Sequence, residues 1–238
     1  MKKLLLGIGL ALAVGPLAFA SVPTLFISSG ATTHTETGAA GTVVYTNGNF
    51  NGWEIDLAFG DSKSPGLDPF GLQLQATTIE CKSRTTGAHS VPVECADLRI
   101  WLSDTDFVQQ PGFIVGYSLT SVSGSIGPTT MKSWVGPGNT LFESDGSDGR
   151  PSGGTALPTI TLTATGGHND TLPVSVSPPY ALTIETLFTG SCAGVNCASY
   201  GSTATISAIP VPEPASVALF GTVLGLCATR LLRRRKRA

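Results

Sequence analysis

Two pairs of acidic residues have a spacing that a calcium site could use. Asp104 and Asp106 lie two apart in an extended segment, which predicts two carboxylates on one side of it. Asp145 and Asp148 lie in a glycine-rich stretch. Ca²⁺ needs six to eight oxygen ligands, and neither stretch matches the EF-hand loop. We therefore expect solvated turn residues and no metal or cofactor, with Ca²⁺ binding at these four aspartates as the alternative.

Three tryptophans offer a second kind of chemistry. Trp53 shares the apolar face of its segment and is predicted to lie in the core. Trp101 falls on the polar side of its segment beside Arg99, and Trp134 lies close to Lys132. Exposed tryptophans on a β-sheet can stack on sugar rings, so Trp101 and Trp134 are candidate glycan contacts. The alternative is a second buried face, in which a loop covers both rings.

Catalytic motifs are missing from the sequence. The three histidines, His34, His89 and His168, do not have the His-x-x-x-His spacing of a zinc protease. There is no Gly-x-Ser-x-Gly elbow, no phosphate-binding loop and no dinucleotide fingerprint. We predict no catalytic residue and no enzyme. A hydrolase whose active site is assembled from distant residues is the alternative.

Four of the five cysteines precede the C-terminal apolar segment, which contains Cys227. These four allow three pairings, and the local one, Cys81–Cys95 with Cys192–Cys197, is the simplest. The first bridge would staple a hairpin-like connection. In the chain-entropy model, closing a loop of about 15 residues stabilises the fold by roughly 3 kcal/mol. Paired cysteines indicate an oxidising compartment.

The formal charge of −2 hides a strong segregation of charge. Between Ser21 and Ala208 there are six basic and fifteen acidic residues, a balance of −9. Most of the basic residues lie at the two ends of the chain. An acidic body excludes a nucleic-acid-binding protein and disfavours polyanions in general.

The N-terminus has the three parts of a secretory signal peptide over residues 1–20. A positive start precedes an apolar stretch and a small-x-small cleavage site, which predicts a mature chain beginning at Ser21. The residues concerned are Lys2 and Lys3, Leu4–Val14, and Ala18 and Ala20.

The C-terminal region, residues 209–238, also has three parts in a fixed order. Pro212, Glu213 and Pro214 precede an apolar run over 215–232. This run predicts a transmembrane helix. A basic tail follows it, which the positive-inside rule places in the cytoplasm; its residues are Arg233, Arg234, Arg235, Lys236 and Arg237.

This order of parts resembles the PEP-CTERM sorting signal of Gram-negative bacteria. The resemblance covers only the C-terminal region, and it implies an exosortase as a partner. It also implies export through an inner-membrane-anchored intermediate to the cell surface or the extracellular space. Substrates of this family are often linked to exopolysaccharide and biofilm, so an exopolysaccharide is the implied second partner.

Between these two ends the sequence alternates with a period of two. Apolar residues recur at every second position and turn residues separate the runs, which is typical of strands with one buried face; the clearest runs start at Trp53, Leu72, Leu98 and Phe113. We predict a flexible lead-in over 21–40 and an antiparallel β-sandwich, jelly-roll-like, over 41–208. Its expected function is structural or adhesive, with a carbohydrate-binding module and a secreted hydrolase as alternatives.

Overall fold

The structure, a computed structural model, describes residues 22–62, 71–82, 85–86, 89–90, 93–108, 112–146, 149–193 and 196–208. The predicted signal peptide and the PEP-CTERM region therefore lie outside the described residues. Within these ranges the chain is all-β, and no helix there is long and apolar enough to cross a membrane.

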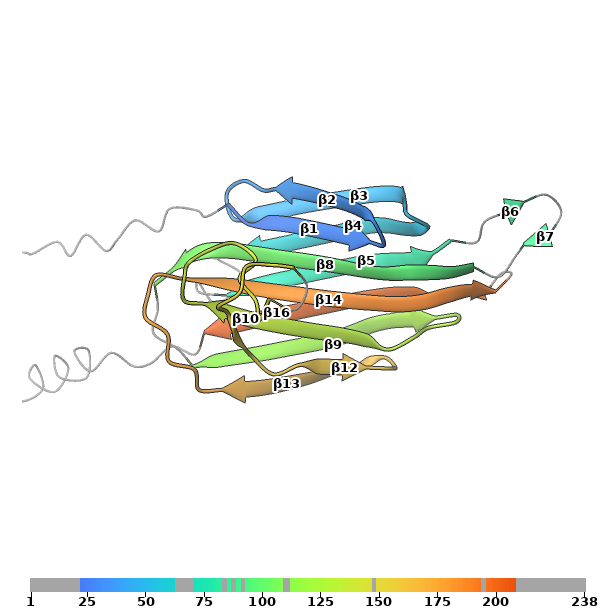
Figure 1. Cartoon of the computed structure of the whole chain (residues 1–238). Helices are drawn as coiled ribbons and strands as arrows, with labels where there is room; N and C mark the ends of the chain where they lie inside the picture. Colours follow the sequence, from blue (N-terminus) through green and yellow to red (C-terminus); the bar gives the residue numbers. More distant parts are fainter. Residues whose placement is uncertain are drawn as a thin grey trace, which may run out of the picture.

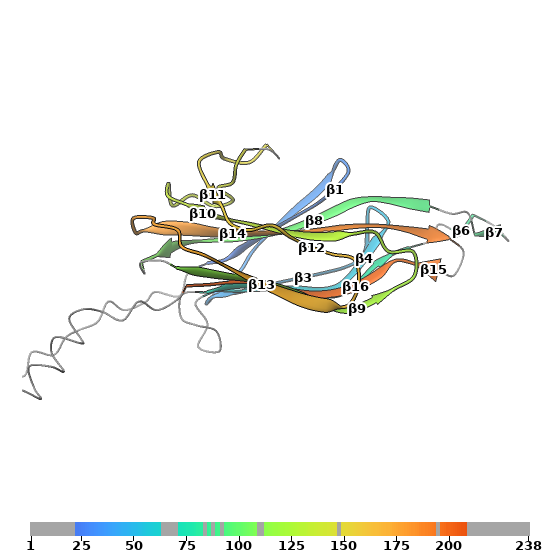
Figure 2. The same cartoon turned by 90° about the horizontal axis from the view of Figure 1, so that it is seen from below.

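Two antiparallel sheets lie face to face (Figures 1 and 2). Sheet A has the strand order β11-β10-β14-β8-β1-β2, with β12 paired to β10 and β15 to β14. Its strands are β1 (Thr24–Ser29), β2 (Thr32–Thr37), β8 (Val93–Phe107), β10 (Thr129–Gly136), β11 (Thr155–Ala156), β12 (Ile160–Leu162), β14 (Tyr180–Ala193) and β15 (Asn196–Cys197).

Sheet B has the order β13-β9-β16-β5-β4-β3. Its strands are β3 (Thr42–Phe50), β4 (Trp53–Ser62), β5 (Leu72–Cys81), β9 (Phe113–Ser123), β13 (Gly166–Leu172) and β16 (Ser199–Ala208). A separate short pair, β6 (Thr85–Thr86) and β7 (His89–Ser90), lies between β5 and β8 in the sequence.

From β5 onward the long strands alternate between the two sheets. β5, β9, β13 and β16 belong to sheet B, whereas β8, β10 and β14 belong to sheet A. The last strand, β16, lies between β9 and β5 and pairs with both. Figure 1 shows that β1 begins and β16 ends at the same end of the sandwich.

The lead-in predicted over 21–40 is wrong for the described residues. β1 and β2 form a hairpin, and β1 pairs with β8 in the interior of sheet A. Leu25 and Ile27 are fully buried in the main core. The many Ser and Thr residues suggested a loose segment, but Thr suits a pleated surface and two apolar side chains suffice to anchor the strand.

The main core lies between the two sheets and confirms most of the predicted alternation. Leu72, Leu74 and Ala76 on β5 are buried, as are the inward residues of β8 and β9. Trp53 is fully buried, as predicted, and its indole N–H donates to the carbonyl of Ala96 at 2.7 Å. This bond links sheet B to sheet A at one end of the sandwich.

A line of β-bulges shifts the inward face partway along sheet B. On β4, Trp53 and Ile55 point inward, but Leu57 and Phe59 do not, against the sequence prediction. The pairing registers of β3 with β4 and of β5 with β16 slip here, and Thr78 has a φ of 50°. A bulge adds one residue, so every side chain after it changes face.

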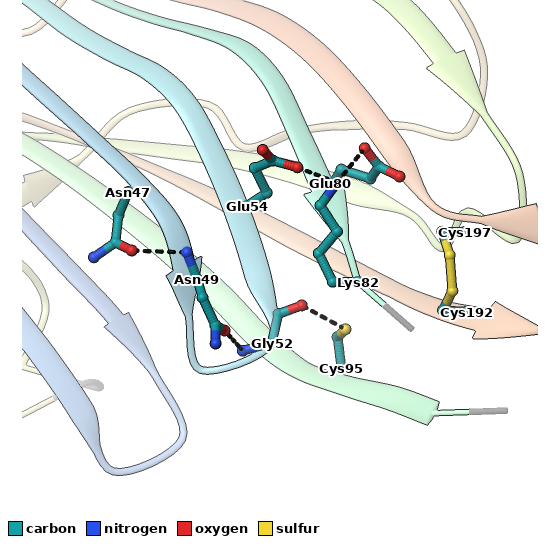
Figure 3. Close-up of polar contacts among 9 residues, drawn as sticks. All are labelled: Asn47, Asn49, Gly52, Glu54, Glu80, Lys82, Cys95, Cys192 and Cys197. Carbon is teal, nitrogen blue, oxygen red and sulfur yellow. Dashed lines mark hydrogen bonds and ion pairs between the residues drawn. A yellow bond between two sulfur atoms is a disulfide. The ribbon is translucent and has the colours of Figure 1, made fainter. Parts of the chain in front are cut away.

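Both predicted disulfides are present. Cys81 is bonded to Cys95, and Cys192 is bonded to Cys197 (the latter shown in Figure 3). The first bridge does not staple a hairpin, because β5 lies in sheet B and β8 in sheet A. It therefore ties the two sheets together next to the bond from Trp53.

Candidate functional site

The outer face of sheet A, which points away from sheet B, carries a second set of apolar and charged side chains. The strand register aligns them in rows. One row runs Lys132–Glu185–Trp101–Phe26 across β10, β14, β8 and β1. A neighbouring row places Arg99 beside Ser28 and Thr33 on β8, β1 and β2. A third contains Trp134 and Ser103.

A loop between β10 and β11 lies over this outer face (Figure 2). We call its described residues, 137–146 and 149–154, the covering loop. The N–H of Phe142 donates to Ser103 Oγ at 2.9 Å, which fastens the loop to the sheet. The buried carboxylate of Glu143 accepts the N–H of Gly138 at 3.1 Å. Gly138 leaves room for that carboxylate, because a Cβ there would lie 3.0 Å from Oε1 of Glu143.

Trp101 and Trp134 are buried beneath the covering loop. Their rings stack at a centroid distance of 5.3 Å with an interplanar angle of 7°, and each residue is 1% exposed. Together with Phe142 they form a core cluster separate from the main one. Neither ring is available to a sugar from solvent, so the covered-face alternative describes both residues.

A buried carboxylate lies among the basic residues of this face. Glu185 is fully buried, and its Oε1 lies 2.6 Å from Nη1 of Arg99. Its Oε2 lies 4.0 Å from Nζ of Lys132. The side chain of Arg99 remains 29% exposed. Arg99 donates to Glu185 through Nη1, and this charge-assisted hydrogen bond orients its guanidinium.

A pocket of about 430 Å³ opens between the covering loop and the β1–β2 hairpin. We call it the outer pocket. The guanidinium of Arg150, from the covering loop, lies 3.4 Å from the ring centroid of Phe26. The pocket thus combines two arginines and two hydroxyls with Phe26, whereas Trp101 beside them is buried. Its lining residues are Phe26, Ser28, Thr33, Arg99, Trp101, Gly149 and Arg150.

The described aspartates proposed as calcium ligands, Asp104, Asp106 and Asp145, form no metal-binding group. Asp104 is buried between the sheets and accepts a hydrogen bond from Ser62 on β4. Asp106 has a φ of 65° and bonds with Asn139 instead, so the two carboxylates do not share one side as predicted. Asp145 lies in the covering loop, and Asp148 lies outside the described residues. Among the described residues, no three His, Cys, Asp or Glu side chains form a metal-binding group.

The outer face of sheet B carries a different arrangement of charge. Lys82 follows β5 and makes ion pairs with Glu54 on β4 and Glu80 on β5 (Figure 3). The hydrogen bond to Glu54, with a second one to Glu80, holds the pKa of Lys82 above its usual value against desolvation. This lysine is neutralised locally and lies far from the outer pocket in the fold, because sheet B is the opposite layer.

Sequence reasoning missed most of the outer pocket. It noted Arg99 beside Trp101 on the polar side of one strand, which the structure confirms. It gave no role to Phe26, Ser28, Thr33 or Arg150. The first three lie in the segment predicted as a loose lead-in, and Arg150 lies 51 positions after Arg99 in a polar loop. Strand pairing places Phe26, Ser28 and Thr33 next to Trp101 and Arg99, and the covering loop adds Arg150 to them.

No family model matches this chain, and no curated protein sequence matches it. Several solved structures show a weak likeness to this chain. TmCBM61 in complex with beta-1,4-galactotriose is 10% identical, with a TM-score of 0.31, over 78% of this chain and 88% of that one. The adhesin domain of Epf from Streptococcus pyogenes is 9% identical, with a TM-score of 0.34, over 82% and 64%.

The third likeness is to the enzymatically active domain of tailspike protein 4 of bacteriophage CBA120. It is 12% identical, with a TM-score of 0.30, over 79% of this chain and 19% of that one. At these scores the three likenesses carry no conclusion about function.

Proposed function

We propose that the chain is an exported, non-enzymatic adhesive protein of the bacterial surface that holds extracellular polysaccharide in its outer pocket. The observation that carries the proposal is the lining of this pocket. Phe26, two hydroxyls and two arginines converge there on a sheet that carries the covering loop and, elsewhere, an inter-sheet disulfide. Such a mixture suits a sugar, which offers an apolar ring face and many hydrogen-bonding groups.

The same lining favours binding over hydrolysis. Most glycosidases use a pair of carboxyl groups about 5–9 Å apart on either side of the scissile bond. No carboxylate occurs among the described residues that line the outer pocket. Glu185 lies beneath Arg99 and is fully buried. We therefore propose a binding protein rather than the secreted hydrolase.

The fold and the two chain ends support the same proposal. Successive long strands alternate between the sheets, so that sheet B contains the order β13-β9-β16-β5 and sheet A the order β12-β10-β14-β8. We propose that this sandwich is a jelly roll. Two disulfides fit an oxidising destination. The predicted signal peptide and the resemblance to a PEP-CTERM signal give the proposed route, with an exosortase as the processing partner.

Retention on polysaccharide tests the adhesive role. The full-length protein, purified in detergent, should be held by insoluble exopolysaccharide from its producing cells. Phe26→Ala should weaken retention about three- to tenfold, because it removes the ring over which the guanidinium of Arg150 is held. Lys82→Gln, on the other sheet, should have no effect. The proposal would be contradicted if the matrix did not retain the wild-type protein. It would also be contradicted if the protein produced new reducing ends in the polysaccharide and lost this activity on replacement of one carboxylate.

The intact mass of the protein in the extracellular fraction tests the proposed route. We expect a species that starts at Ser21 and ends near Glu213. Its mass would report removal of the signal peptide and of the basic tail in one measurement. A species that retains Arg233–Arg237 would show a tail-anchored surface protein and would remove the exosortase from the proposal.

A further inference from the structure

Sheet A ends at β2, and the second edge of this strand has no partner strand among the described residues. All of β2 pairs with β1 in one unbroken register, from Thr24↔Thr37 to Ser29↔Thr32. In the described part of the chain, no backbone hydrogen bond joins residues 32–37 to another strand. Figure 2 shows the tip of the β1–β2 hairpin rising away from sheet B. Such an edge presents a row of N–H and C=O groups to a further strand.

The other edges of the two sheets suit a partner strand less well. The strands β11, β12 and β15 have two or three residues each. The register of β3 with β4 slips twice, and bulges of this kind protect an edge. The edge strand β13 contains two glycines, an asparagine and an aspartate, which are depleted in strands. By contrast, β2 has four threonines in six residues, and threonine favours strands.

The sequence of β2 is complementary to itself when two copies run antiparallel. His34 and Glu36 lie at equal distances from Thr35, one on each side. Thr33 and Thr37 form the next pair outward. If two copies are centred on Thr35, His34 of each copy lies opposite Glu36 of the other. Threonine then lies opposite threonine at the other positions, and both kinds of cross-strand pair stabilise a sheet.

The backbone of β2 has the orientation that this pairing requires. Residues 30 and 31 form the two-residue connection between β1 and β2, and Gly30 has a φ of 56°. A connection of this length is closed by a hydrogen-bonded pair, here Ser29 and Thr32. Hydrogen-bonded and non-hydrogen-bonded pairs alternate from there. The N–H and C=O groups of every second residue over 33–37 therefore point to the free edge, and Thr35 is the central one.

The side chains on this edge are also within reach of a second copy. Nε2 of His34 lies 3.1 Å from Oε2 of Glu36 within one strand, and the two side chains are 37% and 43% exposed. The ring of Tyr45, on β3, packs against the imidazole at a centroid distance of 4.5 Å and supports it from the inner side. The imidazole and the carboxylate can therefore each meet a partner across the free edge.

From this complementarity we infer that β2 pairs with β2 of a second copy of this chain, antiparallel and centred on Thr35. The two copies of Thr35 exchange two hydrogen bonds, and the pairs on either side extend the ladder to about six. The two copies of sheet A then form one continuous sheet. Such a dimer goes beyond the proposed function, since it depends neither on the outer pocket nor on its ligand.

The symmetry of the pair determines how the two copies face. An antiparallel pair within one sheet is related by a two-fold axis perpendicular to that sheet. Both outer pockets therefore open on the same side of the dimer. The strands of the two copies run in opposite directions, so the two β16 strands end at Ala208 toward opposite ends of the dimer. This orientation suits copies held on two facing surfaces.

Cysteine cross-linking locates the pairing. Thr35→Cys in the full-length protein, purified in detergent, should give a disulfide-linked dimer on mild oxidation. Opposed residues of a hydrogen-bonded pair have Cα atoms about 5.5 Å apart, within the range of a disulfide. Thr37→Cys is the matched control on the same strand and face, because its copy lies about 13 Å farther along the strand. We expect about tenfold more dimer from Thr35→Cys than from Thr37→Cys.

A charge exchange tests the register. His34→Glu places carboxylates opposite each other at both cross-strand pairs and should weaken the dimer about tenfold. The double variant His34→Glu with Glu36→His has the composition of the wild type and restores the opposed pairs. Its dissociation constant should return to within about threefold of the wild-type value. Sedimentation equilibrium of the full-length protein in density-matched detergent measures both effects.

Three outcomes would overturn this dimer. The first is equal cross-linking of Thr35→Cys and Thr37→Cys, which would indicate random collision. The second is cross-linking by Asn169→Cys on β13 but not by Thr35→Cys, which would assign the contact to the edge of sheet B. The third is a double variant that dimerises no better than His34→Glu. Retention on polysaccharide is measured separately, so the proposed function stands or falls independently of these results.

Discussion

Replacement of Trp101 by alanine should lower the free energy of unfolding by about 3–5 kcal/mol, the usual range for a fully buried tryptophan. The ring is 1% exposed and stacks on Trp134 at 5.3 Å, and both pack against Phe142 of the covering loop. Without the Trp101 ring, the covering loop loses part of the surface on which it packs. We therefore expect faster proteolytic cleavage within residues 137–154 as well as lower stability. Denaturant titration followed by far-UV circular dichroism measures the first effect.

This result separates two roles for Trp101. A sugar-stacking tryptophan on the surface would affect binding and leave stability almost unchanged, whereas a covered one sets the stability of the loop. Val108→Ala is the matched control, since Val108 is 58% exposed and its truncation should change stability by less than about 0.5 kcal/mol. A loss below about 1 kcal/mol for Trp101→Ala, with the loop still protected, would contradict the covered face.

Stability should also fall steeply between pH 10 and pH 12. Burial raises the pKa of Tyr117 to about 12 and that of Tyr180 to about 12, and burial also raises the pKa of Tyr200. A tyrosine whose pKa is raised in the folded state stabilises the fold fully below pH 10, and this contribution is lost as the pH approaches 12. For Tyr117 and Tyr180 together the expected loss is about 5 kcal/mol.

Urea titrations at pH 8, 10, 11 and 12 measure this loss, and tyrosinate absorbance should rise together with unfolding. Tyr180→Phe is the informative variant. Its hydroxyl is buried and has no hydrogen-bond partner among the described residues, so its removal should be nearly neutral at pH 8. It should also reduce the alkaline loss by about half. A free energy of unfolding that stays constant from pH 9 to pH 12 would refute the prediction.

The sequence predicted the sheets well because strand alternation is a local signal. Leu98, Ile100 and Leu102 face the core as their spacing indicated, and the disulfides join the neighbouring cysteines. The predicted alternation was wrong in the second half of β4, which follows a β-bulge with one extra residue. Leu57 and Phe59 continue the pattern of Trp53 and Ile55 in the sequence, but a bulge moves them to the other face.

The candidate site was less predictable, because it depends on contacts between distant residues. Trp101 was correctly assigned to the polar side of β8 with Arg99. Whether that side is open or covered depends on where residues 137–154 fold, and the residues of that loop are polar and rich in glycine, with no periodic pattern. The buried Glu185 could not be recognised either, since its partners Arg99 and Lys132 are aligned with it only by strand pairing.

The position of β16 has a mechanical consequence. This strand ends at Ala208, from which the chain continues to the predicted membrane anchor, and it is hydrogen-bonded to β9 on one side and to β5 on the other. A pull along its length loads both ladders at once, in shear, whereas the same pull on an edge strand would load one ladder. A load applied beyond Ala208 would thus be borne by two hydrogen-bonded ladders.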